Sequence, residues 1–129
     1  MKNLILILIF INISLGAVDS SSKNYALIIA NNDYKFFDKI PLVDEETKDV
    51  KRQLNQKGFK TVIRKNLNKD NFDIAIKSFI DTFAHKSDEP LFIIYLGHTH
   101  NIKGSSYIIP TETRKPTNRY MEEFYKNSI

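Results

Sequence analysis

The sequence predicts an α/β fold, a three-layer sandwich in which a mostly parallel sheet carries helices on both faces. The first observation behind this prediction is that short continuous apolar runs alternate with longer segments of helical periodicity along the chain. The second is that the resulting order is βαβαβ, in which crossover helices join parallel strands. About three core strands and one small hairpin are expected from this pattern.

The first half of the pattern consists of two strands and the helix between them. Tyr25–Ala30 is a continuous apolar run, which is typical of a strand buried on both faces of a parallel sheet. Asp44–Lys57 has apolar residues at helical spacing and acidic residues in its first turn. Gly58 follows directly, where a left-handed residue commonly ends a helix. Phe59–Ile63 is then the second strand.

The second half adds one helix, one strand and a hairpin. The helix begins after residues 68–70, and a wide apolar stripe predicts that it faces the core, formed by Phe72, Ala75, Ile76, Phe79, Ile80 and Phe83. Leu91–Leu96 is the third buried strand. Residues 103–106 separate two short β-compatible pieces, of which Tyr107–Pro110 is the second, so we expect a hairpin beside the sheet.

The amino terminus has the features of a cleaved secretory signal over residues 1–17. Lys2 supplies a positive charge, Leu4–Leu15 is almost wholly apolar, and Gly16 and Ala17 offer a cleavage point. The apolar run is shorter than the ~20 residues that span a bilayer as a helix, which disfavours an uncleaved anchor. We therefore expect an exported protein, periplasmic or extracellular, with no membrane association after cleavage.

The remaining chain is expected to be a flexible lead-in over residues 18–24 and one partial domain over residues 25–129. The net charge of +4 is mild and the lysines are spread along the sequence, so no nucleic-acid surface is expected. The sequence contains no cysteine, so the core must hold the fold without disulfides. The sequence contains neither of the glycine-rich phosphate-binding motifs, Gly-x-Gly-x-x-Gly and Gly-x4-Gly-Lys-Ser/Thr. We therefore expect no cofactor.

Two polar clusters follow the first and third strands. The first cluster is Asn31, Asn32, Asp33 and Tyr34, and the second is Gly97, His98, Thr99 and His100. Functional groups in parallel sheets gather beyond the carboxyl ends of the strands, which is where both clusters lie. A glycine before a histidine at a strand end permits a sharp turn that exposes the imidazole, so His98 is the main candidate.

Four segments between residues 25 and 113 keep a recognisable order and spacing. They are Tyr25–Tyr34, Asp49–Phe59, Phe92–His98 and Tyr107–Pro110. Together they resemble the large-subunit half of caspase-like cysteine peptidases, a group that includes caspases, metacaspases and their bacterial relatives. The resemblance implies a caspase-like fold that is incomplete in this sequence.

The resemblance also implies roles for the two polar clusters. His98 would be the catalytic base and Gly97 the flanking turn residue, and the backbone amides near Gly97 and Thr99 would help to stabilise the oxyanion. Thr99 stands where the family usually has a second glycine, which adds a side chain close to the substrate. Three residues of the first cluster would line the substrate cleft: Asn31, Asn32 and Asp33.

The nucleophile is the decisive difference from the family. Caspases place the catalytic cysteine roughly 50 residues after the histidine, which lies beyond Ile129. Thr111, Thr113 and Ser128 carry hydroxyl groups, but no spacing places one of them beside His98 as a substitute nucleophile. We therefore expect no peptidase activity from this sequence alone.

A metal site at His98 and His100 is an alternative that we disfavour. Two histidines separated by one residue share a strand face, but a stable site needs three or four ligands. His85 is the only other histidine, and it follows the second helix. We expect no metal.

Two functions remain open at this stage. The chain is either the histidine-bearing part of an exported cysteine endopeptidase, shortened by a truncated gene or completed by a separate cysteine-bearing chain, or a non-catalytic module that binds a peptide or a partner protein. Both predict a peptide or protein as substrate or partner.

The third strand would present an open edge unless Asn118–Asn127 covers it. That segment is either a short amphipathic helix packed on the edge or the start of the family's third helix. An uncovered edge leaves a third alternative, a sheet that does not fold stably.

Overall fold

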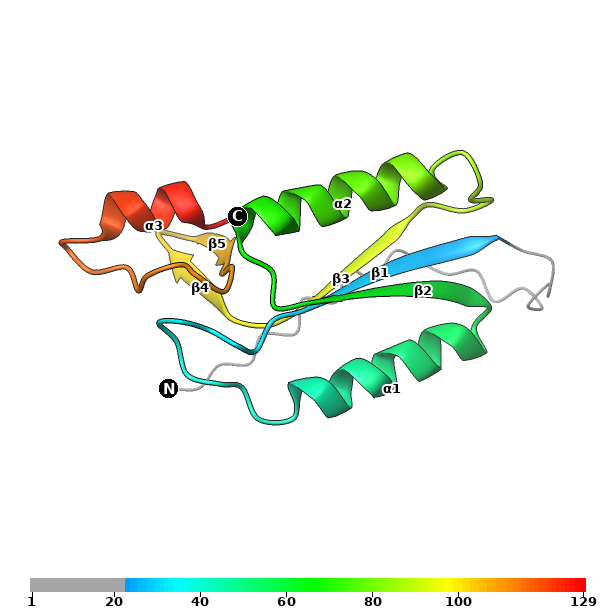
Figure 1. Ribbon diagram of the computed structural model, residues 1–129, viewed down its shortest axis with the longest axis horizontal. Coiled ribbons are helices and arrows are strands. Elements are labelled where there is room, and N and C mark those ends of the chain that lie inside the picture. Colours follow the sequence, from blue (N-terminus) through cyan, green and yellow to red (C-terminus); the bar gives the residue numbers. More distant parts are fainter. Residues whose placement is uncertain (1–22) are drawn as a thin grey trace.

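The computed structural model describes residues 23–129, so the expected signal at residues 1–17 lies outside the described residues. The described chain runs in the order βαβαβββα (Figure 1). The strands are β1 (Asn24–Ala30), β2 (Phe59–Lys65), β3 (Phe92–Leu96), β4 (Thr99–Ile102) and β5 (Ser105–Ile108), and the helices are α1 (Val43–Gln56), α2 (Lys69–Phe83) and α3 (Met121–Asn127).

The main sheet is parallel, with its strands in the order β2-β1-β3. The central strand β1 is buried on both faces, because the side chains from Ala26 to Ile29 have no exposed surface. This is the environment that its continuous apolar run predicts. Asn24, which the sequence placed in the lead-in, pairs with Phe59 and is the first residue of the strand.

Helix α1 covers one face of the sheet and α2 covers the other, which confirms the three-layer arrangement (Figure 1). Gly58, just beyond α1, has φ of 85°, a conformation that favours glycine. Asn68 directly precedes helix α2 and caps it, because its side chain accepts a hydrogen bond of 2.9 Å from the amide of Asn71. That bond satisfies one of the free amides of the first helical turn.

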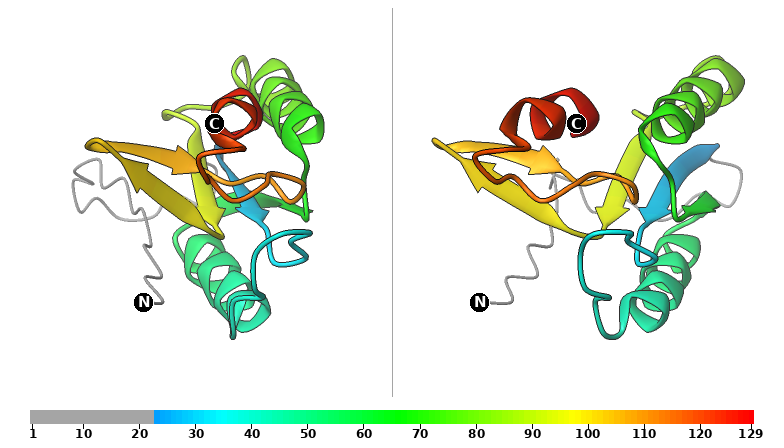
Figure 2. Two further views of the ribbon diagram at one scale, coloured as in Figure 1. Left: turned by 90° about the vertical axis from the view of Figure 1, so that its left-hand side faces the viewer. Right: turned by 60° about the vertical axis from the view of Figure 1, so that its left-hand side comes forward.

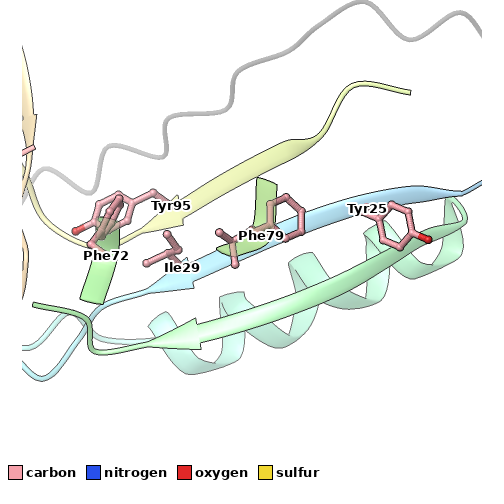
Figure 3. Close-up of a cluster of buried hydrophobic side chains, with 6 residues drawn as sticks. Tyr25, Ile29, Phe72, Phe79 and Tyr95 are labelled. Carbon is pink, nitrogen blue, oxygen red and sulfur yellow. The ribbon is translucent and has the colours of Figure 1, made fainter. Parts of the chain in front are cut away.

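The larger core cluster lies between α2 and the sheet. It joins Tyr25 and Ile29 of β1, Phe72 and Phe79 of α2, and Tyr95 of β3, as Figure 3 shows. Most of the predicted stripe of α2 packs here, but Ile80 is 42% exposed because it lies at the margin of the helix face. A second cluster beneath the other face contains Ile28, Ala30, Val43 and Leu96.

The hairpin of β4 and β5 is antiparallel and stands beside the sheet, with α3 packed on it (Figure 2). Its turn contains only Lys103 and Gly104, with φ of 50° and 83°, so Ser105 and Ser106 belong to β5. The four-residue separator that the sequence suggested is therefore wrong. A two-residue hairpin turn of this kind needs positive φ at both positions, which Gly104 supplies without strain.

Helix α3 does not cover the edge of β3, contrary to one of the sequence-based expectations. Phe124 of α3 is fully buried and meets Tyr107 and His100 of the hairpin at ring distances of 5.8 and 5.7 Å. Ile129 then pairs with Ile108 through two backbone hydrogen bonds. Among residues 23–129, no strand pairs with the outer edge of β3.

No helix within the described part of the chain combines the length and the hydropathy needed to cross a bilayer.

Candidate active site

His98 lies between β3 and β4, two residues after Leu96, the last residue of β3. Its ring is half-buried and packs against two aromatic rings of the loop that follows β1. The ring centroids of Tyr34 and Phe37 lie 4.7 and 5.4 Å from that of His98. The imidazole is therefore held at the carboxyl end of the sheet while part of it remains accessible.

The Nε2 atom of His98 lies 2.7 Å from the backbone carbonyl oxygen of Asp38. A carbonyl oxygen can only accept a hydrogen bond, so Nε2 must carry the proton. In the neutral imidazole the other nitrogen, Nδ1, then has a free lone pair. This contact gives His98 the tautomer that a general base with an acceptor at Nδ1 requires.

Asn31 begins the loop that carries Asp38, and its side chain joins this loop to the loop that follows β2. The side-chain Nδ2 of Asn31 donates to the carbonyl of Leu67 at 3.2 Å, and its Oδ1 accepts from the amide of Leu67 at 2.8 Å. Asn31 is fully buried. The expectation that Asn31 lines the substrate cleft is therefore wrong, because both ends of its amide are used to join the loops after β1 and β2.

Asn32 and Asp33 lie further along the same loop. Asn32 Oδ1 accepts a hydrogen bond of 2.6 Å from the amide of Ile40, and Asn66 Oδ1 accepts from the amides of Asn32 and Asp33, each at 3.0 Å. These residues line a polar hollow of about 250 Å³ together with Asp44, whose contact with Lys65 lowers the pKa of its carboxyl group. His98 does not line this hollow. Contact of Asn32 or Asp33 with substrate stays a prediction.

Gly97 is required for a steric reason. Its φ is not positive, so glycine is not needed here for a left-handed backbone conformation. A Cβ atom at position 97 would instead collide with the hydroxyl oxygens of both Tyr34 and Tyr95. Burial raises the pKa of Tyr34, and it raises that of Tyr95 further, with the neighbouring Tyr34 hydroxyl adding to the effect.

A family model for the caspase domain matches residues 23–127, which is nearly all of the described chain. The chain belongs to the caspase domain family. It is also similar to pig (Sus scrofa) caspase-1, with 29% identity over 73 residues. The aligned region covers 57% of this chain but only 18% of the pig protein, so the chain spans less than a fifth of that relative.

The match to the caspase domain confirms the resemblance inferred from the four segments, and it confirms a relationship to cysteine peptidases. The sequence nevertheless contains no cysteine. Among the hydroxyl-bearing residues considered as substitutes, Thr113 donates its hydroxyl to the carbonyl of Asn127 at 3.0 Å and not to His98. Thr111, Thr113 and Ser128 are all buried.

The two residues that follow His98 in this caspase domain, Thr99 and His100, both belong to the hairpin. Thr99 begins β4 and pairs with Ile108, and His100 packs its ring edge against Phe124. Across residues 23–129 no three His, Cys, Asp or Glu side chains gather in an arrangement that could hold a metal ion.

Sequence reasoning missed two contributors to the site of this caspase domain, the Asp38 carbonyl and the side chain of Tyr95. It placed Tyr34 in the first polar cluster but gave it no role. A backbone carbonyl cannot be recognised from the type of residue that carries it, so the contribution of Asp38 could not have been predicted. Tyr95 carried one signal, because it is a residue with a polar hydroxyl near the carboxyl end of a buried strand.

Replacing Asn31 with alanine should lower the free energy of unfolding by about 2 kcal/mol, because the amide of Leu67 would lose its acceptor and the carbonyl of Leu67 would keep only the amide of Thr111 as a donor. Urea unfolding monitored by circular dichroism measures this change. The matched control is Asn32→Ala, which removes the single contact of a half-buried side chain. Equal losses for the two variants would contradict the structural role of Asn31.

Proposed function

We propose that this chain supplies the histidine half of a caspase-type cysteine endopeptidase site, with the thiol coming from a segment outside this sequence. The observation that carries the proposal is the bond from His98 Nε2 to the carbonyl of Asp38. It leaves Nδ1 as the basic nitrogen on a ring already packed by Tyr34 and Phe37. A preoriented neutral imidazole is what activation of a thiol requires.

The chemistry follows from this arrangement. Nδ1 of His98 removes the proton from the thiol, and the thiolate attacks the carbonyl carbon of the scissile peptide bond. The imidazolium then gives its proton to the leaving amine, and an acyl-enzyme remains for water to hydrolyse. The Asp38 carbonyl supports the positive ring through the Nε2 bond.

The hydrogen bonds around His98 limit which backbone amides could donate to the oxyanion. The amide of His98 itself donates to the hydroxyl oxygen of Tyr34 at 2.7 Å and is occupied. The backbone amides of Gly97 and Thr99 are the remaining candidates in this segment.

The open edge of β3 is where the thiol-bearing segment would join. His98 follows β3, and within the described residues β3 has a partner strand on one side only. Ile93, the second residue of this strand, is 37% exposed. A strand that added parallel to β3 would end beside His98, since parallel strands bring their carboxyl ends to one edge. The apolar residues 4–15 favour export of the assembled activity.

The test begins by trapping the thiol. His98→Cys in the full chain places a thiol at the expected meeting point, and disulfide-linked products from extracts of the source cells are identified by mass spectrometry. His85→Cys and His100→Cys are matched controls, because His85 follows α2 and His100 packs against Phe124. Trapping that is no greater at position 98 than at the two controls would contradict the proposal.

Reconstitution with the trapped polypeptide completes the test. The unaltered chain plus that polypeptide should hydrolyse peptides from a fluorogenic library, and His98→Ala should reduce the rate at least about 100-fold, as loss of a general base does. The chain alone should show no rate above that of His98→Ala. A rate that survives either His98→Ala or alkylation by iodoacetamide would overturn the proposal.

A non-catalytic binding module is the second candidate, and the same open edge of β3 favours it. An extended peptide can add to an exposed strand through backbone hydrogen bonds. In that case the captured polypeptide binds with equal affinity to the unaltered chain and to His98→Ala, and no hydrolysis accompanies binding.

A further inference from the structure

The backbone of His98 is enclosed by two buried tyrosines from different parts of the chain. Tyr34 follows β1 and Tyr95 lies in β3, and their hydroxyl oxygens are 3.0 Å apart. The amide of His98 donates to the Tyr34 hydroxyl at 2.7 Å. The Tyr95 hydroxyl lies 3.0 Å from the carbonyl of His98 and 3.1 Å from that of Ile109.

The donors and acceptors fix the direction of this network. An amide can only donate, so the Tyr34 oxygen accepts from His98. Carbonyl oxygens can only accept, so the single proton of Tyr95 points to His98 or Ile109. The proton of Tyr34 is then the one that bridges the two phenols. The chain of hydrogen bonds starts at the amide of His98 and ends at the carbonyl of either His98 or Ile109.

We propose that Tyr34 and Tyr95 are positioning residues for His98: they hold its peptide groups so that the imidazole reaches the Asp38 carbonyl and keeps Nδ1 free. The relevance to catalysis rests on the proposed function, but the positioning itself is independent of it. The two phenols are the only side chains that hydrogen-bond the His98 backbone in the described chain. Tyr34 also packs its ring on the imidazole, so it acts on both the backbone and the ring.

The tautomer of the His98 imidazole distinguishes a positioning role of the two tyrosines from a role in the stability of the fold alone. Long-range proton–nitrogen NMR spectra of the full chain, at a pH where the ring is neutral, report which nitrogen carries the proton. In the unaltered chain the proton should be on Nε2. Tyr34→Phe and Tyr95→Phe should each lower the ratio of the Nε2–H to the Nδ1–H form about fivefold, the effect of weakening one hydrogen bond.

Tyr25→Phe is the matched control. Tyr25 is a buried tyrosine of the same core cluster as Tyr95, but it stacks on Phe83 and makes no contact with His98. This variant should leave the tautomer ratio unchanged. If Tyr34→Phe and Tyr95→Phe also leave the ratio unchanged, the positioning role is overturned while the proposed function stands. A proton on Nδ1 in the unaltered chain would instead contradict the proposed function.

Hydrogen exchange of the unaltered chain provides a test that needs no variant to fold. The amide of His98 lies outside the strands, yet its bond to the buried Tyr34 hydroxyl should slow exchange at least about 100-fold relative to an unstructured chain. An unprotected His98 amide would overturn the proposal.

Discussion

Replacing Gly97 with alanine is expected to lower the free energy of unfolding by about 3 kcal/mol. The added methyl group would collide with the hydroxyl oxygens of Tyr34 and Tyr95, which are both buried and cannot move into solvent. Relief of the collision would separate the two phenols from the backbone of His98 and break the hydrogen bonds between them. Urea unfolding of the two proteins measures the difference.

Two comparisons make this experiment specific. Gly104→Ala meets no heavy atom within 4 Å, so only its positive φ of 83° is penalised, and the expected loss is about 1 kcal/mol. Adding Tyr34→Phe and Tyr95→Phe to Gly97→Ala removes the two oxygens that collide, so the combined loss should be smaller than the sum of the separate losses. Strictly additive losses would show that the methyl group and the hydroxyls do not meet.

Alkaline pH is expected to destabilise the protein through the same pair of tyrosines. In the folded state burial raises the pKa of Tyr34 and Tyr95 above the ordinary value of 10.0. The unfolded chain therefore releases these protons at a pH where the folded chain still holds them. The stabilisation is fully present below pH 10 and is lost as the pH rises from there towards the folded-state values, by up to about 1.4 kcal/mol per pH unit for each tyrosine.

Denaturant unfolding between pH 8 and 11.5 measures this loss, with the double variant Tyr34→Phe/Tyr95→Phe as the reference. Both proteins share the same lysines and other tyrosines, so the difference between their unfolding free energies isolates the pair. The unaltered protein should have the steeper decline above pH 10. Parallel declines would mean that the two phenols titrate alike in the folded and unfolded states.

Most of the main sheet and its two covering helices could be predicted, because each of these elements has a strong local pattern. The apolar run of β1 and the glycine after α1 mark their elements unambiguously. The bounds of the hairpin were harder to predict, because its turn requires a positive φ at Lys103. A lysine in the sequence gives no indication of such a conformation. The position of α3 depends on packing between Phe124 and Tyr107, a tertiary contact with no periodicity to reveal it.

The candidate site was predictable only where residue type and position in the sequence point to it. His98 could be found from its place after a buried strand, and Gly97 from its place directly before His98. Asn31 was misplaced because a polar residue after a strand can face a cleft or fasten a loop, and the partner that decides this, Leu67, is 36 residues away. The orientation of the imidazole depends on a backbone atom of Asp38, which any residue would supply.

The close approach of Tyr34 and Tyr95 to Gly97 limits which residues relatives of this chain can have at these three positions. Positions 34, 95 and 97 share one small volume, so tyrosine at the first two is compatible only with glycine at the third. Replacement of both tyrosines by smaller residues would make room for serine or alanine before the histidine, whereas phenylalanine at position 95 would keep its Cζ atom 2.7 Å from the added Cβ atom. We therefore expect the residues at these three positions to change together.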